Sequence, residues 1–422
     1  MCGPHRVSRS AALPPARPEA GGAVTGASPT RFPVWPLVAM LATQALATMA
    51  AYSLPAVAPA LARDLGVPGA LVGVFISTVY GVGIASALLS PGFIARFGAV
   101  RVSQFVLLST LAMLLAAAAG SVASIAAGAV LLGLTYGATA PAAAHLLVPR
   151  TPPGVMNLVL SIRQIGVPLG GVLAGLAMVP LTLAVGWREA LLWLAVPVAF
   201  VLVLVQVPRG RWDADRDPSR PIGGRRLLAP FALLGQGAAL RRLAFASFVY
   251  SGVQLIFIAF MTVHLTSRAG FDLVAAGQGL AVYQVSGVVA RPIWGWAADR
   301  LVPARALLAA QGVIMCAAAI LAGRFAPEWP AALVLAVCAV AGATASGFTG
   351  LAYAEWARLG GARRTEATGL GAGIMFTGVL VMPSAFAVAI AATGNYAWPY
   401  AVAGALAAAS GLLLLRGERR IR

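Results

Sequence analysis

The chain is a succession of long apolar runs separated by short segments rich in Gly, Pro and Arg. A helix needs roughly 20 mostly apolar residues to cross a bilayer, and most of the runs reach that length. They are continuous and rich in Leu and Ala, without the period-two alternation of membrane β-strands. The pattern predicts an all-α membrane protein with twelve transmembrane helices, at about 34–60, 68–94, 102–119, 122–147, 155–183, 187–207, 242–266, 273–296, 305–323, 330–354, 366–392 and 398–415.

One long polar segment divides the predicted helices into two sets of six. The sets are related, because aligning 79–101 with 283–305 brings three identical pairs into register: Gly83 with Gly287, Arg96 with Arg300, and Arg101 with Arg305. Such a repeat favours two six-helix bundles that enclose a site between them. We expect a disordered cytoplasmic tail at 1–32, an N-terminal bundle at 33–207, a cytoplasmic linker at 208–241, a C-terminal bundle at 242–416 and a cytoplasmic tail at 417–422.

Composition supports a membrane location. Of the 422 residues, 60% are hydrophobic and only 10% are charged, and the mean hydropathy is +0.88. A soluble protein of this length could not bury so much apolar surface. The first 32 residues lack the apolar core of a secretory signal peptide.

The net charge of +18 could suggest a nucleic-acid-binding protein, but the positions of the charges argue otherwise. With both termini in the cytoplasm, only Arg63, Arg188, Arg268 and Arg324 among the loop arginines face outward. This inside excess is typical of plasma-membrane proteins and fixes the orientation. We therefore expect a multi-pass protein of the inner (plasma) membrane, monomeric, whose partners are the lipid bilayer and a small-molecule substrate, with no nucleic acid.

The segment after the eighth predicted helix, GWAADRLVPAR (Gly295–Arg305), resembles the Gly-x-Leu-Ala-Asp-Arg-x-Gly-Arg-Arg loop signature of the major facilitator superfamily. PGFIARFGAVR (Pro91–Arg101) is similar to a degenerate copy in the first half, with Ala95 where the signature has Asp. The second copy has Val302 where the family usually has Gly. The resemblance covers about 33–416 and implies the superfamily fold and transport by alternating access.

Two arginines fall inside predicted helices, Arg163 in the fifth and Arg291 in the eighth, whereas no Asp or Glu lies in the middle of any. A charge in a bilayer costs roughly 2.5–3.5 kcal/mol, so each needs a reason. Guanidinium groups without acids predict a cavity for an anion. Arg291 also resembles the arginine of monocarboxylate porters, which implies that it binds a substrate carboxylate. The alternatives are snorkelling of Arg291 to the interface, and a hydrogen bond from Arg163 to carbonyls freed near Pro168.

Several uncharged or titratable side chains are further candidates. In the resembled superfamily the first, fourth, seventh and tenth helices line the path, so polar groups there and beside the arginines could contact substrate. Each is about as well explained by packing between helices. The predicted substrate-binding residues are Arg163, Gln164, Arg291, Tyr52, Tyr250, Gln254 and Gln284, with His145 and His264 as weak candidates for proton coupling.

Charged residues at the cytoplasmic helix ends predict an inner gate. A carboxylate after the eighth helix can cap a neighbouring helix or pair with arginines when the inner side is closed. Glu355 resembles the acid that pairs with loop arginines in sugar porters of the superfamily. The predicted gating residues are Arg96, Asp299, Arg300, Glu355 and Arg358.

We expect a secondary active transporter of a small organic anion, with a monocarboxylate as the leading substrate. One alternative is a multidrug or metabolite efflux transporter, but the arginine of drug/proton antiporters is missing from Gly133-Leu-Thr-Tyr-Gly137. A non-transporting membrane sensor is a further alternative. An enzyme is not expected, because we find no nucleotide loop, metal cluster or nucleophile constellation, and we predict no cofactor or metal.

Overall fold

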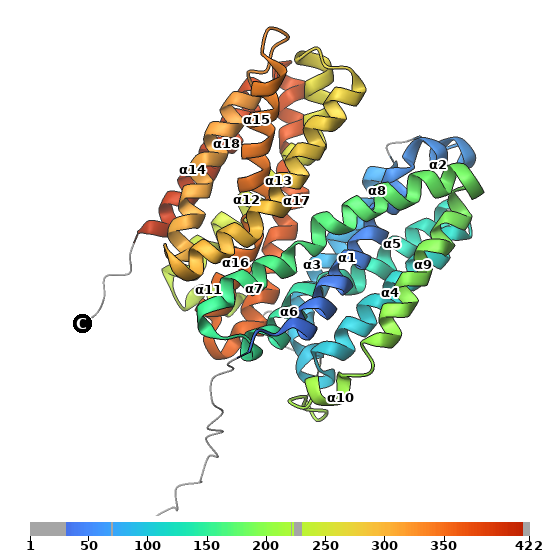
Figure 1. Cartoon of the computed structure of the whole chain (residues 1–422), viewed down its shortest axis with the longest axis vertical. Coiled ribbons are helices and arrows are strands. Elements are labelled where there is room, and N and C mark those ends of the chain that lie inside the picture. The colour runs from blue at the N-terminus through green and yellow to red at the C-terminus, as the bar shows by residue number, and fades with distance from the viewer. Residues whose placement is uncertain (1–30, 69–70, 221, 223–229, 417–422) are drawn as a thin grey trace, which may run out of the picture.

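The computed structural model describes residues 31–68, 71–220, 222 and 230–416, and within these ranges it contains helices and no strand. The chain forms two helical bundles (Figure 1). The first contains α1 (Val34–Ala56), α2 (Ala58–Leu65), α3 (Leu71–Phe97), α4 (Ala99–Ala118), α5 (Val122–Tyr136), α6 (Thr139–Leu147), α7 (Met156–Gln164), α8 (Gly166–Val185) and α9 (Trp187–Leu204).

In chain order, two short helices follow the first bundle, α10 (Arg209–Trp212), which packs on α4, and α11 (Ala232–Gly235), which packs on α12. The second bundle contains α12 (Ala238–Arg268), α13 (Leu273–Arg300), α14 (Ala304–Ala322), α15 (Ala331–Ala341), the π-helical turn η4 (Gly342–Ser346), α16 (Thr349–Gly360), α17 (Arg364–Thr393) and α18 (Ala397–Leu415).

By length and apolar composition, ten stretches of the described chain could cross a membrane. The stretch Ala331–Thr393 counts as one of the ten although it includes α15, α16 and α17, and α13, which carries Arg291, is not among them. Four predicted spans are interrupted: α1 gives way to α2 after Ala56, α5 to α6 after Tyr136, α7 to α8 after Gln164, and α15 to α16 through η4. Interruptions of this kind release backbone groups, and η4 and the α7–α8 break both border the cavity described below.

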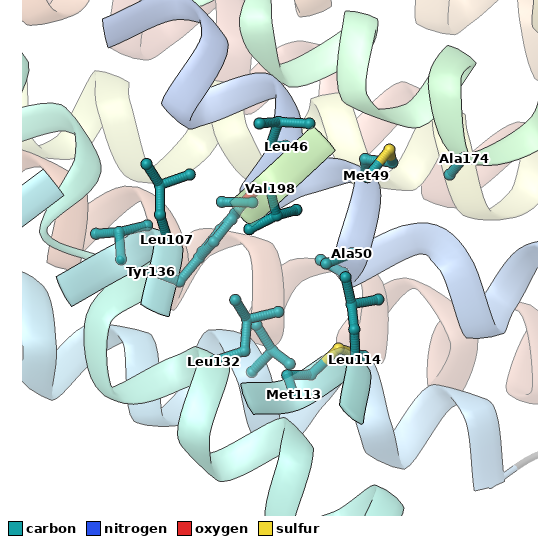
Figure 2. Packing of buried hydrophobic residues seen from close by; sticks show 14 of the residues in the cluster. Leu46, Met49, Ala50, Leu107, Met113, Leu114, Leu132, Tyr136, Ala174 and Val198 are labelled. Atoms are coloured by element: carbon teal, nitrogen blue, oxygen red, sulfur yellow. The ribbon is translucent and has the colours of Figure 1, made fainter. Parts of the chain in front are cut away.

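Each bundle has its own apolar core. The core of the first bundle is built from α1, α4, α5, α8 and α9, and Figure 2 shows Leu46, Met113, Leu132 and Val198 packed within it. The second core lies among α12, α13, α14, α15, α16, α17 and α18, with Phe257, Tyr283 and Tyr400 fully or almost fully buried. The predicted boundaries of the bundles and of the linker stay a prediction.

The bundles touch mainly where α3 packs on α17 and α7 packs on α13, and also where α7 meets α16 and α6 meets α17. Figure 1 shows α1 beginning and α18 ending on one side of the protein, which we call the terminal side. The bundles meet near α7 and α16, whereas the ends that carry α2 and α15 lie apart (Figure 1). The contacts between bundles are therefore concentrated toward the terminal side and the middle of the protein.

Close packing of α8 on α1 depends on Gly170. A Cβ atom at Gly170 would collide with the carbonyl oxygen of Ala45 and the side chain of Thr48, whereas one at Gly175 would meet nothing within 4 Å. We expect Gly170→Ala to lower stability by roughly 1–3 kcal/mol, because overpacking forces backbone to shift. The apparent Tm of the detergent-purified protein measures the effect. Gly175→Ala is the control, and an equal Tm in both variants would contradict the packing argument.

Candidate functional site

A cavity of about 350 Å³ lies between the two bundles, and residues from both line it. Six of the seven predicted substrate-binding residues are in its wall: Tyr52, Arg163, Gln164, Gln254, Gln284 and Arg291. They come from α1, α7, α12 and α13, so the fold brings together side chains that are up to 239 residues apart in the sequence. In membrane proteins built from two repeated bundles, the interface between the bundles is a common location for a ligand site.

Arg163 lies in the last turn of α7 and is only 3% exposed. Its Nη2 donates to Gln44 Oε1 at 2.9 Å, and its Nη1 donates to Gln164 Oε1. Gln44 donates in turn to Thr48 Oγ1 at 2.9 Å, which is hydrogen-bonded to the hydroxyl of Tyr136 at 3.0 Å. The Nε of Arg163 is buried and has no hydrogen-bond partner among the described residues. The guanidinium group is thus held in place with a donor to spare.

Arg291 is fully buried, and all of its contacts are inside the protein. Its Nε and Nη2 donate to the carbonyl oxygen of Ser346 at 3.1 and 2.8 Å, and its Nη1 donates to the carbonyl oxygen of Gln164 at 2.8 Å. Pro168 stands four residues after Gln164 and has no N–H, so this carbonyl lacks its usual helical donor. The sequence suggested that Arg163 donates a hydrogen bond to a carbonyl freed near Pro168. In the structure Arg291 is the residue that donates to this carbonyl.

The cavity has a positive electrostatic character. Two guanidinium groups line it, and no Asp or Glu is present among its described lining residues. The atoms that accept hydrogen bonds from the two arginines are oxygen atoms of side-chain amides, backbone carbonyls and one hydroxyl, and all of them are uncharged. Neutral acceptors lower the cost of burying a cation but leave its charge in place. The site is suited to a negatively charged ligand.

The structure places Tyr250 away from the cavity. Its ring is fully buried inside the second bundle, and its hydroxyl donates to the carbonyl oxygen of Leu308 at 2.7 Å. Gly312 and Gly411 leave room for that hydroxyl. The lining does not include Tyr250, so our prediction of a substrate contact finds no support in the geometry.

The two histidines predicted as weak candidates for proton coupling lie outside the cavity lining. His264 is buried against Tyr396 and Tyr400, with Nε2 2.7 Å from the carbonyl oxygen of Ala322. His145 lies at the terminal side, where Nδ1 is 2.8 Å from Thr365 Oγ1 and Nε2 is 2.9 Å from Asp215 Oδ2. His145, on α6 of the first bundle, thus contacts the second bundle through Thr365 and the linker through Asp215, but it does not line the cavity.

Sequence reasoning missed several lining residues. The aromatic side chains of Tyr80, Tyr136, Tyr353 and Phe376 and the hydroxyls of Ser346 and Thr349 all face the cavity. Each is a common residue in an apolar helix, and no spacing in the sequence marks it. Tyr136, Ser346, Thr349 and Tyr353 lie in the predicted fourth and tenth helices, which the resembled superfamily uses to line its path, whereas Tyr80 and Phe376 lie in the second and eleventh and carry no such signal.

Asp299 joins the bundles at the terminal side. Its Oδ1 accepts from the backbone N–H of Asn157 at 3.0 Å and from Asn157 Nδ2 at 2.8 Å, and its Oδ2 accepts from the N–H of Leu158 at 2.9 Å. These are first-turn amides of α7, which have no acceptor within their own helix. The carboxylate at the end of α13 therefore caps a helix of the other bundle.

The first-half copy of this loop lacks the carboxylate, because Ala95 occupies its place, and the linker makes different contacts there. The buried carboxylate of Asp213 accepts from the N–H groups of Val100 at 2.8 Å and Arg101 at 3.0 Å, in the first turn of α4. Burial raises the pKa of Asp213, while these two hydrogen bonds act to lower it. Arg96 donates to the carbonyl oxygen of Arg220 at 3.3 Å, again in the linker. The linker is thus fastened to the first bundle.

The remaining predicted gating residues are placed at the terminal ends of the helices. Glu355 is buried and accepts from Arg358 Nε at 2.7 Å, a pair within one turn of α16. Arg300 is exposed at the end of α13. Of these residues, Asp299 is hydrogen-bonded directly across the joint between the bundles, and the gating role of all five residues remains a prediction.

Comparison with known proteins supports one family. The family model described as the Major Facilitator Superfamily matches residues 40–359. A curated relative, the probable nitrate/nitrite transporter NarK2 of Mycobacterium tuberculosis, is 37% identical over 98 residues, which are 22% of this chain and 25% of the relative. The match thus spans about a quarter of that relative's length.

Solved structures share the fold at low sequence identity. The human organic anion transporter MFSD10 (TETRAN) superimposes with a TM-score of 0.73 at 18% identity, covering 91% of this chain and 100% of that one. The Escherichia coli fucose:proton symporter FucP gives a TM-score of 0.69 at 13% identity, covering 91% and 99%. At these identities the likeness concerns the fold alone.

The capping contact of Asp299 is testable. We expect Asp299→Ala to remove about 0.5–2 kcal/mol of capping energy from the joint between α13 and α7 and so to loosen it. In a background without the three cysteines, the distance between spin labels at Gly154 and Leu301 should broaden toward longer values. Asp272→Ala is the matched control, because Asp272 accepts from the N–H of Ala275 at 2.7 Å and caps its own helix. Unchanged distances in Asp299→Ala would refute the role.

Proposed function

This chain belongs to the major facilitator superfamily, a family of membrane transporters, and from that premise we propose that it is a secondary transporter of a small organic anion. The observation that carries the proposal is the buried guanidinium group of Arg163, which lines a central cavity with an unused N–H donor and no acid in the described wall. A monocarboxylate is the leading substrate class.

Arg163 is the first ligand in this proposal. An anion that accepts from Nε would complete the hydrogen bonding of a cation already held by Gln44 and Gln164. Hydrogen bonds between charged partners are stronger than neutral ones, and a carboxylate can accept from two guanidinium nitrogens at once. Preorganisation by the amides lowers the entropic cost of binding.

Arg291 has a second role. All three of its guanidinium nitrogens already donate to oxygen atoms, so a direct contact with substrate would compete with the carbonyls of Ser346 and Gln164. Arg291 contributes positive potential to the cavity and ties α13 of one bundle to α7 of the other. The monocarboxylate-porter likeness makes it a candidate for a direct ligand once the bundles move.

Alternating access follows from where the bundles are joined. The hydrogen bonds of Asp299 and the contact between His145 and Thr365 hold the terminal side together. If the terminal side is cytoplasmic, as the excess of arginines there supports, the cavity faces outward in this state. Transport then requires the terminal contacts, and the bond from Arg291 to Gln164, to break as the bundles rock. In this proposal the protein is a monomer of the inner membrane.

A second candidate substrate is a small inorganic monoanion. The relative that matches 98 residues at 37% identity is named as a probable nitrate/nitrite transporter, which favours nitrate or nitrite as an alternative. Both classes carry one negative charge and would use the same guanidinium group. Export of cationic drugs is less well supported, because the described lining of the cavity offers no carboxylate.

Uptake by proteoliposomes tests the proposal. With formate, acetate, lactate and nitrate as substrates and a neutral sugar as the control solute, we expect the wild type to take up one or more anions. Arg163→Ala should lower that uptake by about tenfold or more, because it deletes charge-assisted hydrogen bonds that are worth roughly 1.5–3 kcal/mol.

Two further variants sharpen the result. Arg163→Lys keeps the charge but loses the planar fork, so it should restore uptake only in part. Size-exclusion profiles establish that each variant is folded. Uptake at the wild-type rate by an Arg163→Ala, Arg291→Ala double variant would refute an anion site built on these arginines.

A further inference from the structure

Aromatic side chains from both bundles form part of the cavity wall. Phe376 from α17 of the second bundle packs against two tyrosines of the first bundle. Its ring is stacked on Tyr136 with centroids 5.8 Å apart and lies edge-on to Tyr80 at 5.1 Å. The two tyrosines also meet each other edge-on at 5.8 Å. Three rings thus form one cluster across the joint between α3, α5 and α17.

The cluster is linked to the proposed anion ligand. Phe376, Tyr80 and Tyr136 line the same cavity as Arg163. The hydroxyl of Tyr136 is hydrogen-bonded to Thr48, which accepts from Gln44, the residue that binds the guanidinium group. Aromatic rings in edge-on and stacked contacts hold one another in defined positions. The cavity wall near Arg163 is therefore formed by aromatic side chains that pack against one another.

Gly83 of α3 lies directly against the Phe376 ring, and the absence of a side chain at Gly83 leaves room for that ring. A Cβ atom at Gly83 would lie 3.1 and 3.2 Å from two ring carbons of Phe376 and would meet nothing else within 4 Å. An alanine there must displace the ring by a few tenths of an ångström, since Cβ contacts this close are rare. The neighbouring Gly81 differs, because its Cβ would lie 3.9 Å from a methyl of Leu380, an ordinary contact.

We propose that Phe376, positioned by Tyr80, Tyr136 and Gly83, sets the upper size limit of the transported anion. The inference rests on the proposed function and narrows its substrate class to compact monoanions. A cavity of about 350 Å³ is near the small end of ligand sites, which span roughly 300–1,000 Å³. With the charge of the anion fixed at Arg163, the rest of the molecule must fit in front of the rings.

The test uses two substitutions with opposite expected effects. Phe376→Ala removes the ring and should admit larger anions, whereas Gly83→Ala pushes the ring and should exclude anions that the wild type accepts. Gly81→Ala is the matched control on the same helix. Transport of the best-transported small anion is measured in proteoliposomes. Formate, acetate, propionate, butyrate and benzoate are added as competitors, and the inhibition constant of each is compared among the variants.

We expect the inhibition constant of the largest competitors to fall by about tenfold in Phe376→Ala, since one methylene in an apolar pocket changes discrimination by roughly 10–200-fold. Gly83→Ala should raise the inhibition constant of the largest anions that the wild type accepts, while that of formate stays near the wild-type value. Gly81→Ala should match the wild type throughout. If Phe376→Ala does not fold, Phe376→Leu and Gly83→Ala carry the test, because the first shortens the side chain and the second leaves it intact.

The outcomes separate the two proposals. A wild-type protein that transports no anion overturns the proposed function and this inference with it. Anion transport that depends on Arg163, combined with the wild-type order of competitors in both Phe376→Ala and Gly83→Ala, overturns the size limit alone. A shift in Gly81→Ala as large as that in Gly83→Ala would show that the effect does not pass through the ring.

Discussion

Two guanidinium groups buried in the middle of a membrane protein are the constraint on which the rest of the site depends. Neither has a carboxylate partner in the described structure, and each is held by uncharged oxygen atoms. A bilayer supplies no such oxygens, so the protein must supply them. It does so with Gln44 and Gln164 for Arg163, and with the carbonyls of Gln164 and Ser346 for Arg291.

The irregular parts of the helices follow from this requirement. An α-helix leaves no interior carbonyl without a donor, but Pro168 removes the donor for Gln164. The π-helical turn that ends at Ser346 interrupts the tenth span at the other acceptor. Both irregularities lie where the bundles meet, and one arginine bridges them. The positive charge, the breaks in the helices and the contact between bundles are parts of one arrangement.

The corresponding loops of the two halves make different contacts. Asp299 caps α7 across the joint in the second copy of the loop, whereas Ala95 in the first copy cannot, and the linker residue Asp213 caps α4 within the first bundle. In the middle of the protein, α7 and α13 meet through a charged hydrogen bond, and α3 and α17 meet through Phe376, Tyr80 and Tyr136. The two halves therefore repeat the same order of helices, but equivalent helices make different contacts across the joint.

The sequence alone determined the helical membrane fold and its superfamily, because apolar runs and a loop signature are local patterns. It also singled out Arg163 and Arg291, since a charge within an apolar run is visible without coordinates. Only the tertiary structure separated their roles, by showing a spare donor on Arg163 and carbonyls around Arg291. It also placed Tyr250 inside a bundle and Phe376 in the cavity wall. The physical reason is that apolar helices present aromatic residues on every side, and which side faces the cavity depends on helix rotation and packing, which no short stretch of sequence encodes.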